Sequence, residues 1–313
     1  MMKSNLDLAR ENDNFPYLED DPEHYTRLVS SYYTFHLQDS NAKVGYILPW
    51  VVEKMPWSSA WTIDHKQKRI TPRPRYYSLD EQNTVIAETL QEARARGIFK
   101  VLKGWRDELY PIYGSAAQIS LERAGAALFG IVTFGVHMTV YVKTTEGMKI
   151  WVPRRARNKQ TYGGMLDNSV AGGISTGEKP LDSLVREAAE EASLPEDLVR
   201  KDAKACGLVT YFYIQDERAG GETDLLQPEC QYVYDLEVEE CVVLKPGDNE
   251  VEDFSLWSVA EAQKALAEGQ FKPNCAVVLL DFFVRHGILT AENERDYIEI
   301  VARLHRKLPF PMA

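Results

Sequence analysis

Apolar and less apolar residues alternate in the middle of the chain. From Val136 to Val142 every second residue is apolar, and His137, Thr139 and Tyr141 lie between them. This period of two is typical of a β-strand whose two faces meet different surroundings. Other stretches rich in β-branched and aromatic residues predict further strands at 149–152, 208–214 and 230–238.

Between residues 181 and 192 the period changes, and apolar residues recur at helical spacing. These residues are Leu181, Leu184, Val185, Ala188 and Ala192. Glu187, Glu190 and Glu191 project from the opposite side of such a helix, within an arc of roughly 100°. We therefore expect a helix that packs on a sheet and carries three carboxylates on one solvent-facing ridge.

Two later segments also begin as helices do. Ser258 and Glu261 form a capping-box pattern, and Pro273 opens the apolar segment AVVLLDFFV. Strands interspersed with helices predict an α/β fold, in which helices cover a sheet. His137 is a candidate to face a substrate, although a strand histidine is more often exposed or hydrogen-bonded to a neighbour.

Three neighbouring carboxylates suggest a site for a cation. Like charges this close repel one another unless a cation compensates them, and hard divalent ions prefer oxygen ligands. Mg²⁺ suits an open acidic ridge, because it keeps several waters and bridges a few carboxylates to substrate phosphates. The alternative is that the three glutamates are simply a solvated helix face.

The helix and the loop before it follow one longer pattern, G-x5-E-x7-R-E-U-x-E-E, in which U is aliphatic. Its fixed positions are Gly172, Glu178, Arg186, Glu187, Glu190 and Glu191. The pattern resembles the signature of the Nudix hydrolases, which cleave diphosphates joined to another moiety. The resemblance implies an α/β/α sandwich with a mixed sheet.

The same resemblance implies roles for the residues of the pattern. Glu187, Glu190 and Glu191 correspond to ligands of Mg²⁺, with Mn²⁺ as a substitute, and one of them or a nearby acid assists deprotonation of water. With Arg186 they form the expected catalytic set. Arg186 is also expected to pair with Glu178, and this pair, with Gly172 and Gly173, supports the loop against the helix.

Ser193 departs from the family pattern, which has a helix-ending glycine at this position. If Ser193 adopts the left-handed conformation, the local cost is roughly 1 to 2 kcal/mol. No expected metal ligand is lost, so the departure concerns only the end of the helix.

A basic loop at 153–168 precedes the glycines and contains Arg154, Arg155, Arg157 and Lys159. Guanidinium forks match phosphate oxygens, so these residues are candidates to bind substrate, although a charge run is usually solvated. The arrangement R-R-x-R-x-K followed by G-M-L-D-N-x-V-A-G-G resembles Nudix proteins of fungi and plants that stand alone or are fused to thiamine pyrophosphokinase. Those proteins carry an additional amino-terminal domain.

We therefore divide the chain into an N-terminal extension, a small α/β domain and a Nudix hydrolase domain, at 1–19, 20–125 and 126–313. The last boundary is placed near the small-residue run AGAA. The first domain could form one wall of a substrate cleft, since clefts between domains are common binding sites.

The subfamily resemblance implies hydrolysis of an organic diphosphate to its monophosphate and phosphate, with diphosphates of the damaged thiamines oxothiamine and oxythiamine as substrates. Two alternatives stay open: a hydrolase of ADP-ribose or NADH, and a Nudix-fold regulator that only binds its ligand. An isopentenyl diphosphate isomerase is disfavoured, because that chemistry uses a cysteine before the pattern. All four cysteines here follow it, at Cys206, Cys230, Cys241 and Cys275.

Composition and net charge limit the classes of partner that the protein is expected to bind. The chain has 313 residues and a formal charge of −11, which disfavours nucleic acid and leaves a small-molecule diphosphate as the expected partner. The sequence shows neither a secretory signal nor a membrane span, and the cysteines have no C-x-x-C spacing, so a cytoplasmic protein with reduced thiols is expected. A homodimer is left open.

Overall fold

The computed structural model describes residues 2–38, 40–73, 79–159 and 161–312. The elements up to residue 129 are α1 (Asn5–Asn12), α2 (Pro22–Ser31), β1 (Tyr33–His36), β2 (Lys43–Ile47), α3 (Pro49–Lys54), β3 (Trp61–Asp64), β4 (Arg69–Pro72), α4 (Leu79–Ala95), the 3-10 turn η1 (Val101–Gly104), β5 (Leu109–Ile112), β6 (Ile119–Glu122), η2 (Arg123–Gly125) and α5 (Ala126–Phe129). The later elements are β7 (Thr133–Thr144), β8 (Gly147–Arg155), β9 (Val170–Gly173), α6 (Pro180–Ala192), α7 (Glu196–Asp202), β10 (Lys204–Ile214), η3 (Glu217–Ala219), β11 (Leu226–Glu237), β12 (Val251–Ser258), α8 (Val259–Ala267), α9 (Pro273–Arg285) and α10 (Tyr297–Leu304).

The larger sheet is built by the second half of the chain. Its strand order is β10-β11-β7-β8-β12, and β9 pairs with β7 beside this path. β11 and β7 run parallel while the other neighbours run antiparallel, so the sheet is mixed. The four strands predicted from the sequence correspond to β7, β8, β10 and β11.

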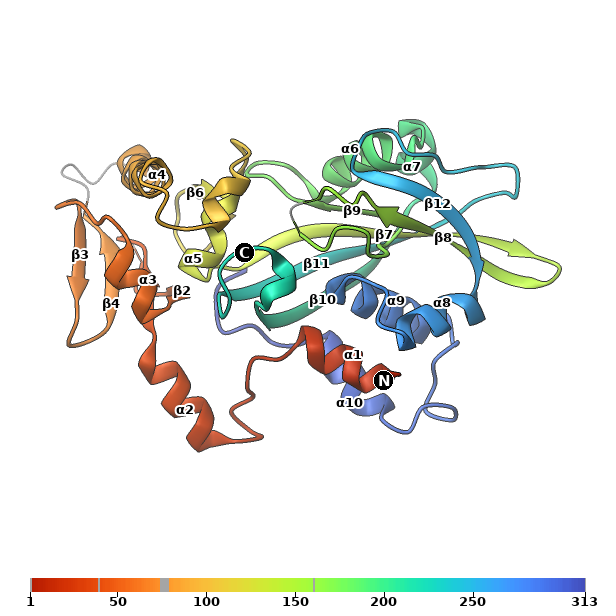
Figure 1. The fold of residues 1–313 in the computed structure, drawn as a ribbon, viewed down its shortest axis with the longest axis horizontal. Helices are drawn as coiled ribbons and strands as arrows, with labels where there is room; N and C mark the ends of the chain where they lie inside the picture. Colours follow the sequence, from red (N-terminus) through yellow and green to blue (C-terminus); the bar gives the residue numbers. More distant parts are fainter. Residues whose placement is uncertain (1, 39, 74–78, 160, 313) are drawn as a thin grey trace.

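Helices cover both faces of this sheet (Figure 1). On one face, Leu184 and Ala188 of α6 are fully buried in the same core as Met138 of β7. On the other face lie α8, α9 and α10, and Tyr141 of β7 packs against Phe282 of α9 with ring centroids 5.5 Å apart. Because successive side chains of β7 point to opposite faces, the strand contributes residues to the cores on both sides of the sheet. The predicted α/β/α sandwich with a mixed sheet is confirmed.

The helix starts predicted at Ser258 and Pro273 are also confirmed. Ser258 and Glu261 make the reciprocal capping box of α8, and Pro273 occupies the first turn of α9. No helix in the described ranges is long and apolar enough to cross a membrane.

The first half of the chain forms a small α/β region with its own sheet, of strand order β2-β1-β4-β3. Its core is aromatic: the Phe35 ring lies 6.2 Å from that of Trp61 and 5.0 Å from that of Phe129. The hairpin β5–β6 follows, and α4 packs against β6. Strand β5 of this hairpin contacts β7 of the larger sheet, and α5 contacts β11.

The two chain termini pack together on the half of the chain that builds the larger sheet. Helix α1 packs against α9 and α10. Beyond it, Arg306 donates a 2.9 Å hydrogen bond to the buried carboxylate of Asp13, and the rings of Phe15 and Phe212 stack at 4.0 Å. Buried residues of both halves belong to one hydrophobic cluster. The division at 1–19, 20–125 and 126–313 stays a prediction.

Candidate active site

A cavity of about 290 Å³ lies where the hairpin β5–β6 meets the larger sheet. Tyr110 of β5 and Arg123 after β6 contribute to one wall. Strand β9 contributes Ala171, Gly172 and Gly173 to another, so the loop glycines found in the sequence pattern border the cavity.

Helix α6 begins at Pro180 and ends at Ala192, as its apolar period predicts. Ser193 adopts φ 54° and ψ 31°, which is the left-handed conformation. Leu194 then donates its backbone N–H to the carbonyl of Ala188 at 3.1 Å, which closes the helix end. A serine therefore stands where glycine would be free of the steric cost between Cβ and backbone.

The three glutamates of α6 do not share a solvent-facing ridge, and this part of the prediction is wrong. The side chain of Glu190 is 52% exposed, but that of Glu187 is 14% exposed. The carboxylate of Glu191 turns inward and accepts the backbone N–H of Ala171 at 3.0 Å. The reason is that β9 packs along this side of α6, and Glu187 and Glu191, one turn apart, both face it.

Gly172 makes room for one of these carboxylates. A Cβ atom on Gly172 would lie 2.1 Å from Cδ of Glu187, well inside van der Waals contact. Burial raises the pKa of Glu187 above its ordinary value. Burial, followed by the charges of Asp167 and Glu187, raises the pKa of Glu191 well above its ordinary value. Two carboxylates are thus held close to a cavity-lining strand in surroundings that disfavour their negative charge.

This donor set fits a hard divalent cation. Within the part of the chain that the structure describes, no three Asp, Glu, His or Cys side chains form a ready-made metal cage. Mg²⁺ does not require one, because it commonly takes one or two carboxylates and completes its shell with waters and substrate phosphates. A cation beside Glu187 and Glu191 would also relieve the unfavourable burial of their charge.

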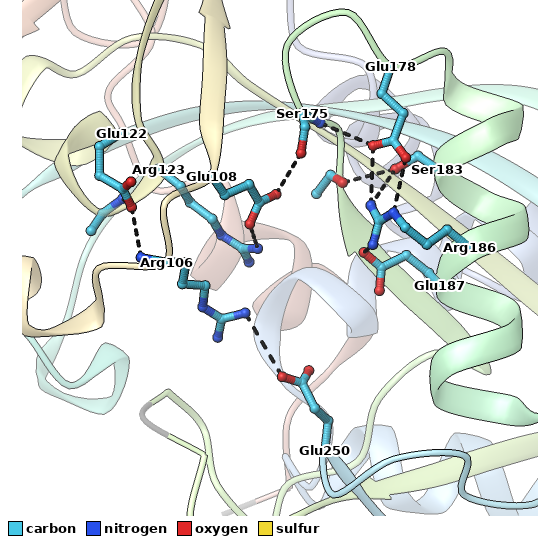
Figure 2. A network of polar contacts seen from close by, with 12 residues as sticks. Arg106, Glu108, Glu122, Arg123, Ser175, Glu178, Ser183, Arg186, Glu187 and Glu250 are labelled. Atoms are coloured by element: carbon cyan, nitrogen blue, oxygen red, sulfur yellow. Dashed lines mark hydrogen bonds and ion pairs between the residues drawn. The ribbon is translucent and has the colours of Figure 1, made fainter. Parts of the chain in front are cut away.

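Arg186 joins the loop to the helix (Figure 2). Its guanidinium donates to both oxygens of Glu178, at 3.0 and 3.2 Å, so the predicted ion pair is present. It also donates to Glu187 at 2.8 Å and to Glu190 at 3.3 Å. Ser183 of the same helix donates to the carbonyl of Gly173 at 2.9 Å. The loop is therefore fixed to α6 at several points.

The four basic residues of the loop at 153–168 separate into two pairs. Arg155 and Lys159 line the cavity, where Arg155 pairs with Asp167 and Lys159 pairs with Glu250. The other two point elsewhere. Arg154 donates to the carbonyl of Gly164 at 2.9 Å, and the 83% exposed side chain of Arg157 lies 3.5 Å from Glu252.

Several cavity residues have no motif that marks them in the sequence. Glu229 of β11 lines the cavity and accepts a hydrogen bond from Gln231 at 2.7 Å. Lys272 lines it just before α9. Tyr211 and Tyr213 of β10 line the cavity and are buried in the core that includes α9, while Phe212 between them belongs to the core that includes α6. Strand alternation is the signal that separates the two faces.

His137 is buried and also lines the cavity, where it lies 2.7 Å from Asn168 through Nδ1. Burial lowers the pKa of His137 to about 4, so the ring is neutral near pH 7. A neutral, hydrogen-bonded histidine matches the structural role that is usual for a strand position.

Two protein families match successive parts of the chain. Residues 27–133 match a family described as Domain of unknown function (DUF4743), and residues 133–276 match the family described as NUDIX domain. The Saccharomyces cerevisiae protein named Uncharacterized protein YJR142W is 35% identical over 304 residues, which cover 93% of this chain and 88% of that protein.

Two Arabidopsis thaliana proteins are also similar. Nudix hydrolase 20, chloroplastic, is 35% identical over 232 residues, covering 73% of this chain and 59% of that protein. Nudix hydrolase 24, chloroplastic, is 29% identical over 280 residues, covering 84% of this chain and 73% of that protein.

Proposed function

The chain belongs to the Nudix family and is a Nudix hydrolase, and we propose that it hydrolyses an organic diphosphate to the monophosphate and phosphate with Mg²⁺ held by Glu187, Glu190 and Glu191. Nudix hydrolases act on small-molecule diphosphates and generally use a divalent metal. Mn²⁺ is the expected substitute here. The identity of the acting residues and the identity of the substrate are separate parts of the proposal.

One observation carries the proposal. Glu187 and Glu191 contact the strand residues Ala171 and Gly172 that border the cavity, while Arg155 and Lys159 line the same cavity. Acidic groups suited to a metal therefore contact the cavity-lining strand, and basic groups suited to phosphate line the same cavity. Diphosphate hydrolysis needs both, because charge on the phosphoryl oxygens must be stabilised while water attacks phosphorus.

The reaction adds water across the anhydride. The water oxygen bonds to the terminal phosphorus, the bond from that phosphorus to the bridging oxygen breaks, and a carboxylate of α6 takes the proton. Mg²⁺ held by the α6 carboxylates would supply positive charge to the phosphoryl oxygens and favour deprotonation of water. Arg155 and Lys159 bind and orient the phosphates, and Arg186 keeps Glu187 in place through its 2.8 Å hydrogen bond.

We propose damaged thiamine diphosphates, those of oxothiamine and oxythiamine, as the substrates. The support is the resemblance of the basic loop and glycine segment to Nudix proteins related to thiamine pyrophosphokinase. The cavity wall adds to it, because the half-buried Tyr162 lines the cavity and can stack on a flat heterocycle. Gln215 and Gln227 line it too and can pair with polar ring substituents.

Phosphate release from a panel of diphosphates tests this assignment. The panel contains the diphosphates of oxothiamine, oxythiamine and thiamine, with ADP-ribose and NADH, each assayed with Mg²⁺ and with a chelator. ADP-ribose and NADH release no phosphate on cleavage, so their nucleotide products are separated by chromatography. We expect the damaged thiamine diphosphates to be cleaved preferentially and only with metal. Cleavage confined to ADP-ribose or NADH would replace the thiamine assignment and keep the hydrolase.

A further inference from the structure

The cavity carries positive charge on its N-terminal side that no sequence motif marks. Arg106 and Arg123 both line it, and both come from the region before the NUDIX match. Figure 2 shows Arg123 beside Glu108, Arg106 directed toward Glu250, and Glu187 beside Arg186. The Arg106 pair is long at 3.9 Å and its side chain is 43% exposed, so Arg123 is the better fixed of the two.

Arg123 is held by the hairpin β5–β6. Its backbone N–H donates to the carbonyl of Glu108 at 2.8 Å, and its guanidinium Nη1 donates to the Glu108 carboxylate at 2.8 Å. The guanidinium carbon also lies 5.4 Å from the centre of the Tyr110 ring. These contacts fix the direction of the side chain before any ligand arrives, which lowers the entropy lost on binding.

The same hairpin is hydrogen-bonded to the loop between β9 and α6. The second oxygen of Glu108 accepts the hydroxyl of Ser175 at 3.0 Å, so one carboxylate bridges Arg123 and the loop. Thr176 donates its backbone N–H to the carbonyl of Leu109 at 2.8 Å. Movement of the hairpin would therefore move the loop with it, and the position of Arg123 relative to α6 is set by direct contacts.

The Glu187 carboxylate lies against the cavity that Arg123 helps to line. Gly172 lines the same cavity, and a Cβ atom on it would lie 2.1 Å from Cδ of Glu187. A guanidinium on this cavity suits a phosphate that also reaches the metal-binding carboxylates, since its planar fork offers paired donors to paired oxygens.

We propose that Arg123 is a phosphate-binding residue, so that the N-terminal α/β region completes the active site by holding the substrate diphosphate from its own wall of the cavity. The proposal rests on the proposed function for the identity of the ligand as a diphosphate. It gives the region matched by DUF4743 a direct part in the reaction, beyond packing.

Binding of imidodiphosphate, a diphosphate that resists hydrolysis, tests the proposal by calorimetry in the presence of Mg²⁺. Arg123→Met should weaken binding by about tenfold or more, and Arg123→Lys by a smaller factor, because lysine keeps the charge and loses the fork. Arg96→Met is the matched control: its 61% exposed side chain pairs with Glu92 in the same region, away from the cavity. That variant should bind like the wild type.

Kinetics on the best substrate of the panel separate this role from a structural one. A phosphate-binding role predicts a higher KM and lower kcat/KM in Arg123→Met, matching the lost affinity, whereas a structural role predicts a lower Tm with unchanged affinity. If Arg123→Met does not fold, Arg123→Lys is measured in its place. Unchanged imidodiphosphate affinity in a folded Arg123 variant would overturn the proposal.

The two proposals fail differently. If the wild type binds imidodiphosphate and cleaves nothing in the panel, the proposed function fails, and loss of binding in Arg123→Met still supports the phosphate site. If the wild type cleaves a diphosphate and Arg123→Met does so with equal kcat/KM, the function stands and the role of Arg123 is overturned.

Discussion

The contact between Tyr110 and Gly173 allows a quantitative test of how closely the two regions fit. A Cβ atom on Gly173 would lie 1.8 Å from the Tyr110 hydroxyl oxygen and 2.8 Å from its Cζ. To restore ordinary contact in Gly173→Ala, the ring must retreat by about 1.5 Å or more. Tyr110 is only 6% exposed, so the ring has little space to move into. We expect Gly173→Ala to lower the free energy of unfolding by about 1 to 3 kcal/mol, the usual cost of overpacking.

A double-mutant cycle with Tyr110→Phe isolates this contact. Removing the hydroxyl removes the nearest atom but leaves Cζ at 2.8 Å, so the cost of Gly173→Ala should fall without vanishing. We expect a coupling of about 0.5 to 2 kcal/mol, measured by urea denaturation of the wild type, both single variants and the double variant. Additive effects of the two substitutions would show that the hydroxyl does not limit the space at Gly173, and would refute the reasoning.

Two further predictions concern stability. Ser193→Gly should raise the free energy of unfolding by about 1 kcal/mol, because glycine adopts the left-handed conformation without the steric cost that serine carries; an equal or lower Tm would contradict this. Burial lowers the pKa of His137 to about 4, below its value near 6.5 in an unfolded chain, so the unfolded state binds more protons between these values and stability falls as pH drops through them. At pH 5 this linkage lowers the free energy of unfolding by about 2 kcal/mol. His137→Gln lacks the titrating ring, so urea denaturation should show a smaller loss of stability between pH 7.5 and 5 for this variant than for the wild type. An equal loss in both proteins would contradict the assignment.

The strands and helices that carry the larger sheet could be predicted because each has a clear apolar period. β7 alternates and α6 repeats at helical spacing, so both burial and direction follow from sequence alone. The orientation of Glu191 could not be predicted in this way. Strand β9 has only four residues, two of them glycine, and shows no alternation that would place it beside α6.

The basic loop shows a second feature of the site that the sequence alone does not predict. Arg154 and Arg155 are adjacent at the end of β8, and adjacent strand residues point to opposite faces, so only one of them can face the cavity. Which one does so depends on the pairing of β8 with β12, a long-range feature. The N-terminal wall of the cavity likewise arises from docking of the hairpin β5–β6, and no local pattern marks Tyr110 or Arg123.

The central claim is that the carboxylates of α6 hold the metal that cleaves the diphosphate. Its most direct test is Mg²⁺-dependent turnover of the best panel substrate by the wild type, by Glu191→Gln and by Glu196→Gln. Glutamine can still accept the Ala171 N–H, which Glu191 binds at 3.0 Å, so the first variant keeps the local geometry while removing the charge. Glu196, with a 64% exposed side chain on α7, is the matched control.

We expect Glu191→Gln to lose activity by about 100-fold or more, with a Tm no lower than that of the wild type, because a buried charge is removed. Glu196→Gln should keep full activity. Full Mg²⁺-dependent turnover by folded Glu191→Gln would contradict the account.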